Sequence, residues 1–175
     1  MPELRINGMI EESIVDGPGL RFVVFTQGCP HGCPGCHNPE THDVFGGRLV
    51  HTEVILAQFG QNPLLSGMTF SGGEPFLHAK ALANLAEQVH ALGKTVIVYT
   101  GYTVEELHVL AKTRAEVQAL LDQADTLVDG PYLEALRECD SGLRGSSNQR
   151  ILDRQTVRSL CRELAAQEAQ RPVAC

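Results

Sequence analysis

One run of the sequence limits the possible folds more than any other: Gly28-Cys29-Pro30-His31-Gly32-Cys33-Pro34-Gly35-Cys36-His37-Asn38. Its glycines and prolines predict a compact, turn-rich loop. Three thiols stand on this loop, at Cys29, Cys33 and Cys36, with three and then two residues between them. Because thiolate is a soft and strongly donating ligand, three of them this close can hold a metal centre without help from distant parts of the chain. We therefore expect a metal-binding loop.

The number of cysteines on the loop points to an open coordination position. An ordinary four-iron cluster takes one cysteine per iron, so a loop with three leaves one iron free to bind something other than protein. Open positions are where bound metals do chemistry, as catalytic zinc shows. Two alternatives remain: structural zinc with His31 or His37 as a fourth ligand, or thiols that bind nothing. The close spacing of three among only six cysteines disfavours the second, and no further CxxC-like half follows to complete an ordinary zinc site.

Length and charge bound the class of protein. With 175 residues, 43% of them apolar and 20% charged, the chain is expected to form a single domain over residues 1–175, ending in a helix and tail from about residue 154. The formal net charge of −7 gives no electrostatic support for a nucleic-acid partner, and we assign none.

The expected cellular compartment follows from two features that the sequence lacks, a membrane span and a signal peptide. No apolar stretch approaches the length of a membrane span, so we expect no membrane partner, and the first five residues do not begin a signal peptide. We expect a cytoplasmic protein whose thiols stay reduced. The scattered Cys139, Cys161 and Cys175 lack ligand spacing and are expected to be buried or terminal thiols without a role.

Short β-branched or aromatic runs alternate with longer helical patterns, which predicts an α/β fold with a mainly parallel sheet. Within the second expected helix, Leu82, Leu85, Ala86 and Val89 share one face and predict a core stripe. Strands are expected at 4–10, 21–27, 68–70, 95–99, 126–128 and 150–152. Helices are expected at 52–59, 79–92, 104–121 and 154–167.

A second glycine-rich segment, Ser71-Gly72-Gly73-Glu74-Pro75, directly follows an expected strand, as the cysteine loop does. Loops at the carboxyl ends of parallel strands gather at one edge of the sheet, so these two should meet. Gly72 and Gly73 let backbone approach a ligand closely because they have no Cβ. Glu74 could accept hydrogen bonds from an ammonium or ribose group. Alone, such a turn is more often a plain connection, but beside the cysteine loop it indicates a binding site.

Several motifs together resemble a known family. The spacing Cys29-x3-Cys33-x2-Cys36 followed by Ser71–Pro75 resembles the radical S-adenosylmethionine (SAM) enzymes. More narrowly, Val15-Asp16-Gly17-Pro18-Gly19-Leu20-Arg21 and Cys36-His37-Asn38 are similar to the glycyl-radical-enzyme activases. Three further segments resemble one branch of these activases, the branch that activates anaerobic ribonucleoside-triphosphate reductase. They are Tyr99-Thr100-Gly101-Tyr102, Leu127-Val128-Asp129-Gly130 and Arg144-Gly145-Ser146-Ser147-Asn148-Gln149-Arg150. The likeness extends from about Ile10 to Asp153.

The resemblance implies an enzyme with two cofactors: one 4Fe-4S cluster held by Cys29, Cys33 and Cys36, and SAM chelated to the fourth iron. One electron passed into the sulfonium would break a carbon–sulfur bond and yield methionine and a 5′-deoxyadenosyl radical. That radical would abstract a hydrogen atom from a glycine of the partner reductase. A low-potential donor such as flavodoxin or ferredoxin would supply the electron. The protein orients the cofactors and excludes water, and no further catalytic residue is implied.

The resemblance also implies the positions that contact SAM: Gly35, Cys36 and His37 along its length, and Gly72, Gly73 and, as a weaker candidate, Glu74 at its amino group. The wider family places an aromatic residue where this chain has Gly35, whereas the branch named above resembles this chain there. The packing of the adenine ring is therefore left open, with His37 the nearest candidate. The segment from Arg144 to Arg150 would meet either SAM or the partner's glycine loop.

The implied fold is of the radical SAM type. The chain has too few βα units to close an eight-stranded barrel, so we expect a partial (β/α) barrel of about five to six units. Its open mouth would admit the glycine loop of the reductase. The alternatives are an activase of another glycyl radical enzyme, such as pyruvate formate-lyase, which the segment from Arg144 to Arg150 disfavours, and a non-catalytic zinc or iron–sulfur module.

Overall fold

The structure, a computed structural model, describes residues 2–138 and 142–170 of the chain. Its centre is a seven-stranded sheet in the order β3-β1-β2-β4-β5-β6-β7. The strands are β1 (Glu3–Ser13), β2 (Arg21–Thr26), β3 (Arg48–His51), β4 (Gly67–Gly72), β5 (Thr95–Tyr99), β6 (Thr126–Asp129) and β7 (Arg150–Asp153). The helices are α1 (Thr52–Phe59), α2 (Ala79–Ala91), α3 (Val104–Ala111), α4 (Ala115–Gln123) and α5 (Arg154–Ala169), with short 3-10 turns η1 (Pro39–Thr41), η2 (Pro75–His78) and η3 (Glu134–Leu136).

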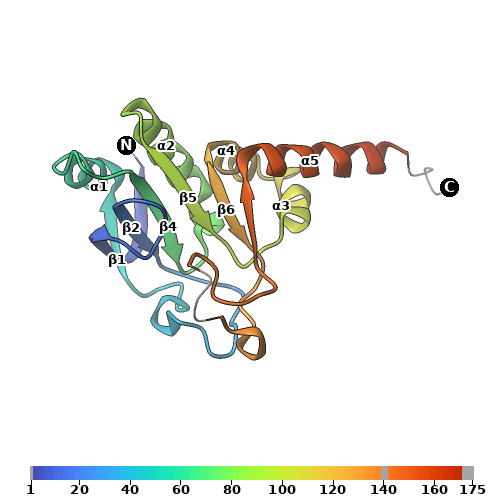
Figure 1. The fold of residues 1–175 in the computed structure, drawn as a ribbon, viewed down its shortest axis with the longest axis horizontal. Helices are drawn as coiled ribbons and strands as arrows, with labels where there is room; N and C mark the ends of the chain where they lie inside the picture. The colour runs from blue at the N-terminus through green and yellow to red at the C-terminus, as the bar shows by residue number, and fades with distance from the viewer. Residues whose placement is uncertain (1, 139–141, 171–175) are drawn as a thin grey trace.

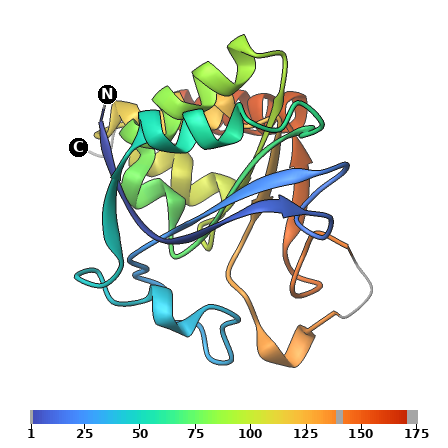
Figure 2. The same cartoon turned by 90° about the vertical axis from the view of Figure 1, so that its left-hand side faces the viewer.

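The four central strands, β2, β4, β5 and β6, run parallel. Their crossovers all step in the same direction across the sheet, and because such crossovers are right-handed, the connecting helices must share one face. Figures 1 and 2 show the helices gathered on one side of the sheet. At the edges, β1 pairs antiparallel with β2 and β3, and β7 pairs antiparallel with β6. The expected α/β class is confirmed, with a parallel centre and antiparallel edges.

The main core lies between the helix layer and the sheet. Leu82, Leu85, Ala86 and Val89 of α2 are fully buried there, as expected for a core stripe. Successive strand side chains point to opposite faces, so the residue after each core position faces the other way. Val24, Phe70 and Val98 belong to the core, whereas the next residues along β2, β4 and β5 line a cavity on the opposite face: Phe25, Ser71 and Tyr99.

Strand β3 and the helix expected at 104–121 differ from the sequence prediction. The sequence does not predict β3, a four-residue strand with polar ends that forms by pairing with β1. The single expected helix is instead two, α3 and α4, separated by residues 112–114. The amides of Thr113 and Arg114 both donate to the carbonyl of Leu110 and close α3. No glycine or proline marks this break, so the sequence pattern predicts one continuous helix there.

Arg21 at the start of β2 is fully buried rather than a simple strand-start charge. Its guanidinium donates to the hydroxyls of Thr69 and Thr95 at 3.1 and 2.7 Å. It also donates to the carbonyls of Met68 and Thr95. Burial lowers the pKa of Arg21 to about 10. Arg21 thereby joins β2 to β4 and β5 through four hydrogen bonds.

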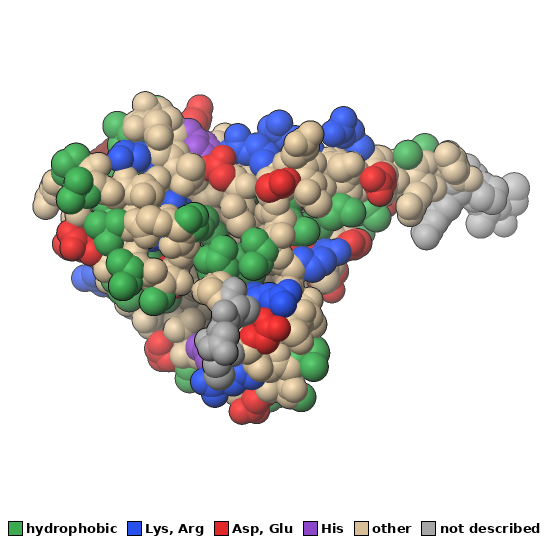
Figure 3. All heavy atoms as spheres, viewed as in Figure 1, with side chains coloured by type: hydrophobic (Ala, Val, Ile, Leu, Met, Phe, Trp, Pro, Cys, Tyr) green, Lys and Arg blue, Asp and Glu red, His purple; other side chains and the backbone are tan. Residues whose placement is uncertain are grey.

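Two long segments lie beyond the carboxyl ends of the parallel strands: residues 27–47 after β2, and residues 130–138 with 142–149 between β6 and β7 (Figures 1 and 2). Helix α5 forms the expected C-terminal helix and extends away from the sheet, carrying basic and acidic side chains side by side (Figure 3). Cys161 is half-buried on α5, where burial raises the pKa of its thiol. Cys139 and Cys175 lie outside the described residues. In the described ranges, no helix has the length and hydropathy needed to cross a bilayer.

Candidate functional site

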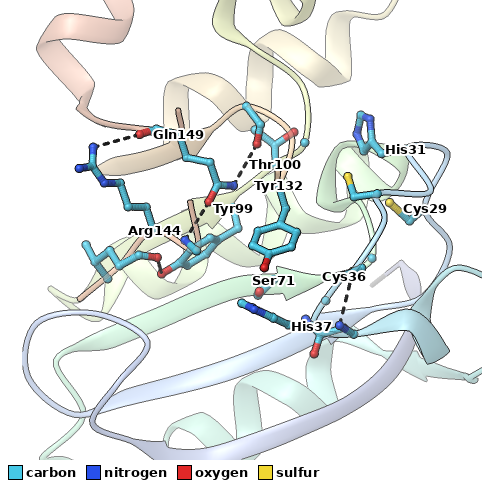
Figure 4. Close-up of a pocket in the computed structure, with 18 of the residues that line it drawn as sticks. Cys29, His31, Cys36, His37, Ser71, Tyr99, Thr100, Tyr132, Arg144 and Gln149 are labelled. Atoms are coloured by element: carbon cyan, nitrogen blue, oxygen red, sulfur yellow. Dashed lines mark hydrogen bonds between the residues drawn. The ribbon is translucent and has the colours of Figure 1, made fainter. Parts of the chain in front are cut away.

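A cavity of about 490 Å³ opens at the carboxyl ends of β2, β4, β5 and β6. Residues from all four following loops line it, as expected for parallel strands that end at one edge. The cysteine loop forms one side, and Tyr99, Arg144 and Gln149 lie opposite (Figure 4). The prediction that the two glycine-rich loops meet here is confirmed, because the amide of Glu74 donates to the carbonyl of Gly28 at 2.8 Å.

All three predicted cysteines of the loop line the cavity and are partly exposed. The loop is shaped by its own backbone: the amide of Cys36 donates to the carbonyl of Cys33, and that of Cys29 donates to His42. The amide of Asn38 donates to the sulfur of Cys36 at 3.4 Å, a contact that stabilises a thiolate ligand. Burial raises the pKa of the Cys29 thiol, and binding to iron would oppose that shift because the ligand is the thiolate.

The donor set fits an iron–sulfur cluster. Within the described residues, no three His, Cys, Asp or Glu side chains converge on a point where a single metal ion could bind. In a four-iron cluster each cysteine holds a different iron, so the three sulfurs need not converge on one point. What the cluster needs is three accessible thiols around one space, and Cys29, Cys33 and Cys36 supply these.

Gly72 and Gly73 also line the cavity, and the structure explains why each lacks a side chain. Gly72 has a φ of +92°, and a Cβ there would overlap the backbone of Phe25 and Thr26. A Cβ on Gly73 would lie 2.3 Å from the carbonyl oxygen of Gly28. Both glycines are therefore required for close packing of the β4 turn against β2 and the start of the cysteine loop. This packing leaves their backbone at the cavity wall.

Glu74 lies beside these glycines but is fully buried and is not part of the cavity lining. Its carboxylate accepts hydrogen bonds from the amides of Phe76 and Gly101, both at 2.9 Å. It also accepts from the hydroxyl of Thr100 and lies 2.8 Å from Nε2 of His31. These contacts are all made within the chain, so the structure directs this carboxylate toward neighbouring loops.

Gly35 has a φ of +72°, and a Cβ at this position would lie 2.6 Å from the carboxyl carbon of Glu134. The positive φ disfavours a side chain at position 35, and the Glu134 side chain of the η3 turn lies beside it. Aromatic surface is supplied elsewhere in the wall: His37 and Tyr132 lie with ring centroids 4.8 Å apart. In Figure 4 the Tyr132 ring stands over His37 at the centre of the cavity. Gly145 backs this pair, since a Cβ there would lie 3.2 Å from the Tyr132 ring.

Residues 142–149 form the opposite wall. The Gln149 side-chain oxygen accepts from the amides of Gly145 and Ser146, while its nitrogen donates to the carbonyl of Gly130. Arg144 pairs with Glu138 at 2.7 Å, and its side chain is about one-third exposed. The phenol of Tyr99 donates to the carbonyl of Leu143, and burial raises its pKa. A cationic group is thus held at the cavity by several hydrogen bonds.

Of the predicted site residues, Cys29, Cys33, Cys36, His37, Gly72 and Gly73 line the cavity, whereas Gly35 and Glu74 do not. Sequence reasoning did not assign Tyr99, Tyr132 or His42 to the site, although all three line the cavity. Tyr99 ends β5 and Tyr132 follows β6, so the rule that located the first two loops would also have found these residues. The buried Nε2 of His42 has no hydrogen-bond partner among the described residues, which leaves an unsatisfied polar atom in a cavity-lining residue.

Comparison with known proteins gives a consistent family. Residues 15–152 match the family described as "4Fe-4S single cluster domain". The anaerobic ribonucleoside-triphosphate reductase-activating protein of Salmonella typhimurium is 36% identical over 155 residues, covering 83% of this chain and 96% of that protein. Its counterparts in Escherichia coli K12 and enterobacteria phage T4 are 34% and 33% identical, over 78% of this chain and 90% and 86% of theirs. The solved structure of QueE from Escherichia coli aligns with 58% of this chain and 54% of its own, with a TM-score of 0.49 and 22% identity.

Proposed function

This chain belongs to the family of anaerobic ribonucleoside-triphosphate reductase-activating proteins, and from that membership we propose that it activates such a reductase by radical chemistry on SAM. The observation that carries the proposal is the cavity itself, where three cysteine thiols and the backbone of Gly72 and Gly73 face one space. A single cluster held by Cys29, Cys33 and Cys36 has one iron without a protein ligand. The amino and carboxylate groups of SAM would complete its coordination.

When bound, the cluster supplies one electron that cleaves SAM to methionine and a 5′-deoxyadenosyl radical, which becomes 5′-deoxyadenosine by taking a hydrogen atom from a glycine of the reductase. The chain's own residues bind and orient. Backbone at Gly72 and Gly73 would receive the amino group, and the loop from Gly35 to His37 would lie along the cosubstrate. Walls on several sides limit the access of water to the reacting atoms.

We assign the adenine ring to the aromatic pair of His37 and Tyr132. Gly35 takes the place of the aromatic residue found at this point in the wider family, and its φ of +72° disfavours any side chain there. The Tyr132 ring, which lines the cavity, would offer a stacking surface from the segment after β6. Arg144 lines the opposite side of the cavity from the cysteine loop, where its segment would meet SAM or the glycine loop of the reductase.

The partner and the setting follow from the same proposal. We propose that the sheet is a partial (β/α) barrel, open at its edges, whose mouth would admit the glycine-bearing loop of anaerobic ribonucleoside-triphosphate reductase. A low-potential flavodoxin or ferredoxin supplies the electron. A reducing cytoplasm keeps the thiols available for iron. No nucleic-acid partner is proposed.

The test uses the full chain, reconstituted with iron and sulfide under strict anaerobiosis. We expect a brown protein with about four irons per chain that, once reduced, forms 5′-deoxyadenosine from SAM. Adding the candidate reductase should produce a glycyl radical doublet in electron paramagnetic resonance spectra. Substitution of Cys29, Cys33 or Cys36 by Ala should abolish both signals, whereas Cys161→Ala, on α5, should retain them.

Three outcomes would contradict parts of this proposal. A colourless protein with about one zinc per chain would show a zinc module instead. A four-iron protein that forms no 5′-deoxyadenosine would be a non-catalytic iron–sulfur module. A doublet that appears only with a formate-lyase-type enzyme would move the partner to another glycyl radical enzyme.

A further inference from the structure

We propose that His31 is a positioning residue for the cysteine loop, which it ties through the buried carboxylate of Glu74 to the turn after β5. The inference rests on the proposed function only in naming what the loop holds. It assigns a role to a histidine that the spacing of the cysteines left as a possible zinc ligand. His31 stands between Cys29 and Cys33, so whatever fixes its ring also fixes the path of the loop.

The carboxylate of Glu74 is the shared point of attachment. It is fully buried and accepts hydrogen bonds from three loops. The amide of Phe76 donates from its own turn, and Nε2 of His31 donates from the cysteine loop. The hydroxyl of Thr100 and the amide of Gly101 donate from the turn after β5. Because the partner atom is a carboxylate oxygen, Nε2 must be the ring nitrogen that carries the proton. Three separate loops therefore meet on one acidic group.

The ring of His31 is also held by shape. It packs edge-on against Tyr102, with ring centroids 4.5 Å apart. A Cβ on Gly101 would lie 2.4 Å from the ring, so only glycine at this position leaves room for it. The side chain of His31 is only 16% exposed. His31 lines the cavity on the same side as Cys29 (Figure 4), and its Nε2 lies 2.8 Å from the buried carboxylate of Glu74.

The physical consequence is preorganisation. A glycine- and proline-rich loop loses conformational entropy when its three thiols are fixed around a cluster. If His31 already holds the loop in the folded chain, part of this entropy is lost on folding rather than on cluster binding. The cluster then dissociates more slowly. Removing a residue that orients the metal ligands commonly weakens metal affinity by about 10- to 100-fold. His31 would act in this way on the loop that carries Cys29 and Cys33.

The test compares His31→Ala with His90→Ala. His90 is a matched control, because it is also a half-buried histidine with Nε2 2.9 Å from a carboxylate, that of Asp125, and it lies on α2 away from the cavity. Amide hydrogen exchange over residues 29–36 is measured by mass spectrometry in the cluster-free chain. Loss of iron to a chelator is measured in the cluster-loaded chain. Circular dichroism confirms the fold of each variant.

We expect His31→Ala to speed both exchange and iron loss by roughly tenfold, with His90→Ala at wild-type rates. His31→Gln, whose amide can still donate to Glu74, should recover part of the difference. Gly101→Ala leaves both partners in place but displaces the ring, and should loosen the loop in the same way if His31→Ala fails to fold.

Equal exchange rates over residues 29–36 in wild type, His31→Ala and Gly101→Ala would overturn the inference. So would failure of His31→Gln to differ from His31→Ala. If the wild-type chain takes up no four-iron cluster, the proposed function fails, and the exchange measurement on the cluster-free chain still decides the role of His31.

Discussion

At the scale of single residues, Glu74 has a structural role that its place in the sequence hides. Its neighbours Gly72 and Gly73 face the cavity, but its carboxylate points into the protein. The reason is local: Glu74 caps the η2 turn by accepting from the amide of Phe76. Spacing along the chain places a residue at the site, whereas the direction of its side chain depends on donors from distant loops. Thr100 and Gly101, which follow β5, supply those donors.

Glu74→Gln should destabilise the fold. The Glu74 carboxylate accepts from the Phe76 and Gly101 amides, the Thr100 hydroxyl and the His31 ring, so a carboxamide would turn a donor toward another donor. A buried polar group left unsatisfied costs about 1–3 kcal/mol, and we expect the free energy of unfolding in urea to fall by about this amount. Glu87→Gln, on the exposed face of α2, is the control and should leave it unchanged. Equal stability of the two variants would contradict the role given to Glu74.

Tyr132 should contribute to cosubstrate binding through its ring. Stacking of a base on an aromatic side chain is worth about 1–3 kcal/mol, so Tyr132→Ala should weaken SAM binding by roughly tenfold. Tyr132→Phe keeps the ring and should bind nearly as wild type. Calorimetric titration of the cluster-loaded protein checks this, with methionine as a ligand that lacks adenine. If Tyr132→Ala weakens methionine binding as much as SAM binding, the ring is not the adenine contact.

At the scale of elements, one arginine joins three of them. Arg150 at the start of β7 bonds to Asp129 at the end of β6 and to Glu105 in the first turn of α3. Asp129 in turn accepts from the amide of Val104 at 2.8 Å. This cluster fixes α3 against the sheet beside the point where residues 130–149 begin and end.

The cluster predicts a specific acid sensitivity. Hydrogen bonding to Arg150 lowers the pKa of Glu105 to about 2, below its ordinary value of 4.5. A lowered folded-state pKa means that Glu105 stabilises the protein above about pH 4.5 and loses this contribution as the pH falls toward 2. Glu105 is 44% exposed, so solvent screening limits the contribution to about 1 kcal/mol or less.

Urea unfolding of wild type and Glu105→Gln between pH 7 and pH 3 measures this contribution. The wild type should be more stable at pH 7, and the difference should shrink toward pH 3. A difference that stays constant over this range would mean that the charge of Glu105 contributes nothing. Asp122→Asn on α4 serves as an exposed-carboxylate control.

The elements that the sequence predicted well are those with long, regular patterns. Helix α1 and strand β5 have the expected bounds, and the four-residue stripe of α2 is buried as expected. Strand β3 could not be found because its pairing with β1 brings together residues more than forty positions apart in sequence. The break between α3 and α4 has no glycine or proline to mark it, and buried apolar residues occur on both sides of it: Val104 and Leu107 on α3, Val117 and Leu120 on α4.

At the scale of the whole molecule, the cavity lies at one end of the sheet and opens outward. Proximity of two proteins around this opening would exclude solvent from the cysteine loop. We therefore expect the partner reductase to slow the loss of iron to a chelator, whereas serum albumin at the same concentration should not. Stopped-flow absorbance of the iron–chelator complex measures the rates. Identical rates with and without a reductase that becomes activated would show that docking leaves the opening uncovered.

The way residues 130–149 are anchored has a consequence for how such proteins diversify. This segment leaves the sheet after Asp129 and returns at Arg150, and these two residues are direct partners in the antiparallel register of β6 and β7. Both ends are thus fixed at one point, and the closure cost of a surface segment grows only slowly with its length. Insertions or deletions between Asp129 and Arg150 would therefore leave the pairing of β6 and β7 in register. We expect changes within residues 130–138 and 142–149 to alter one wall of the cavity without shifting the cysteine loop.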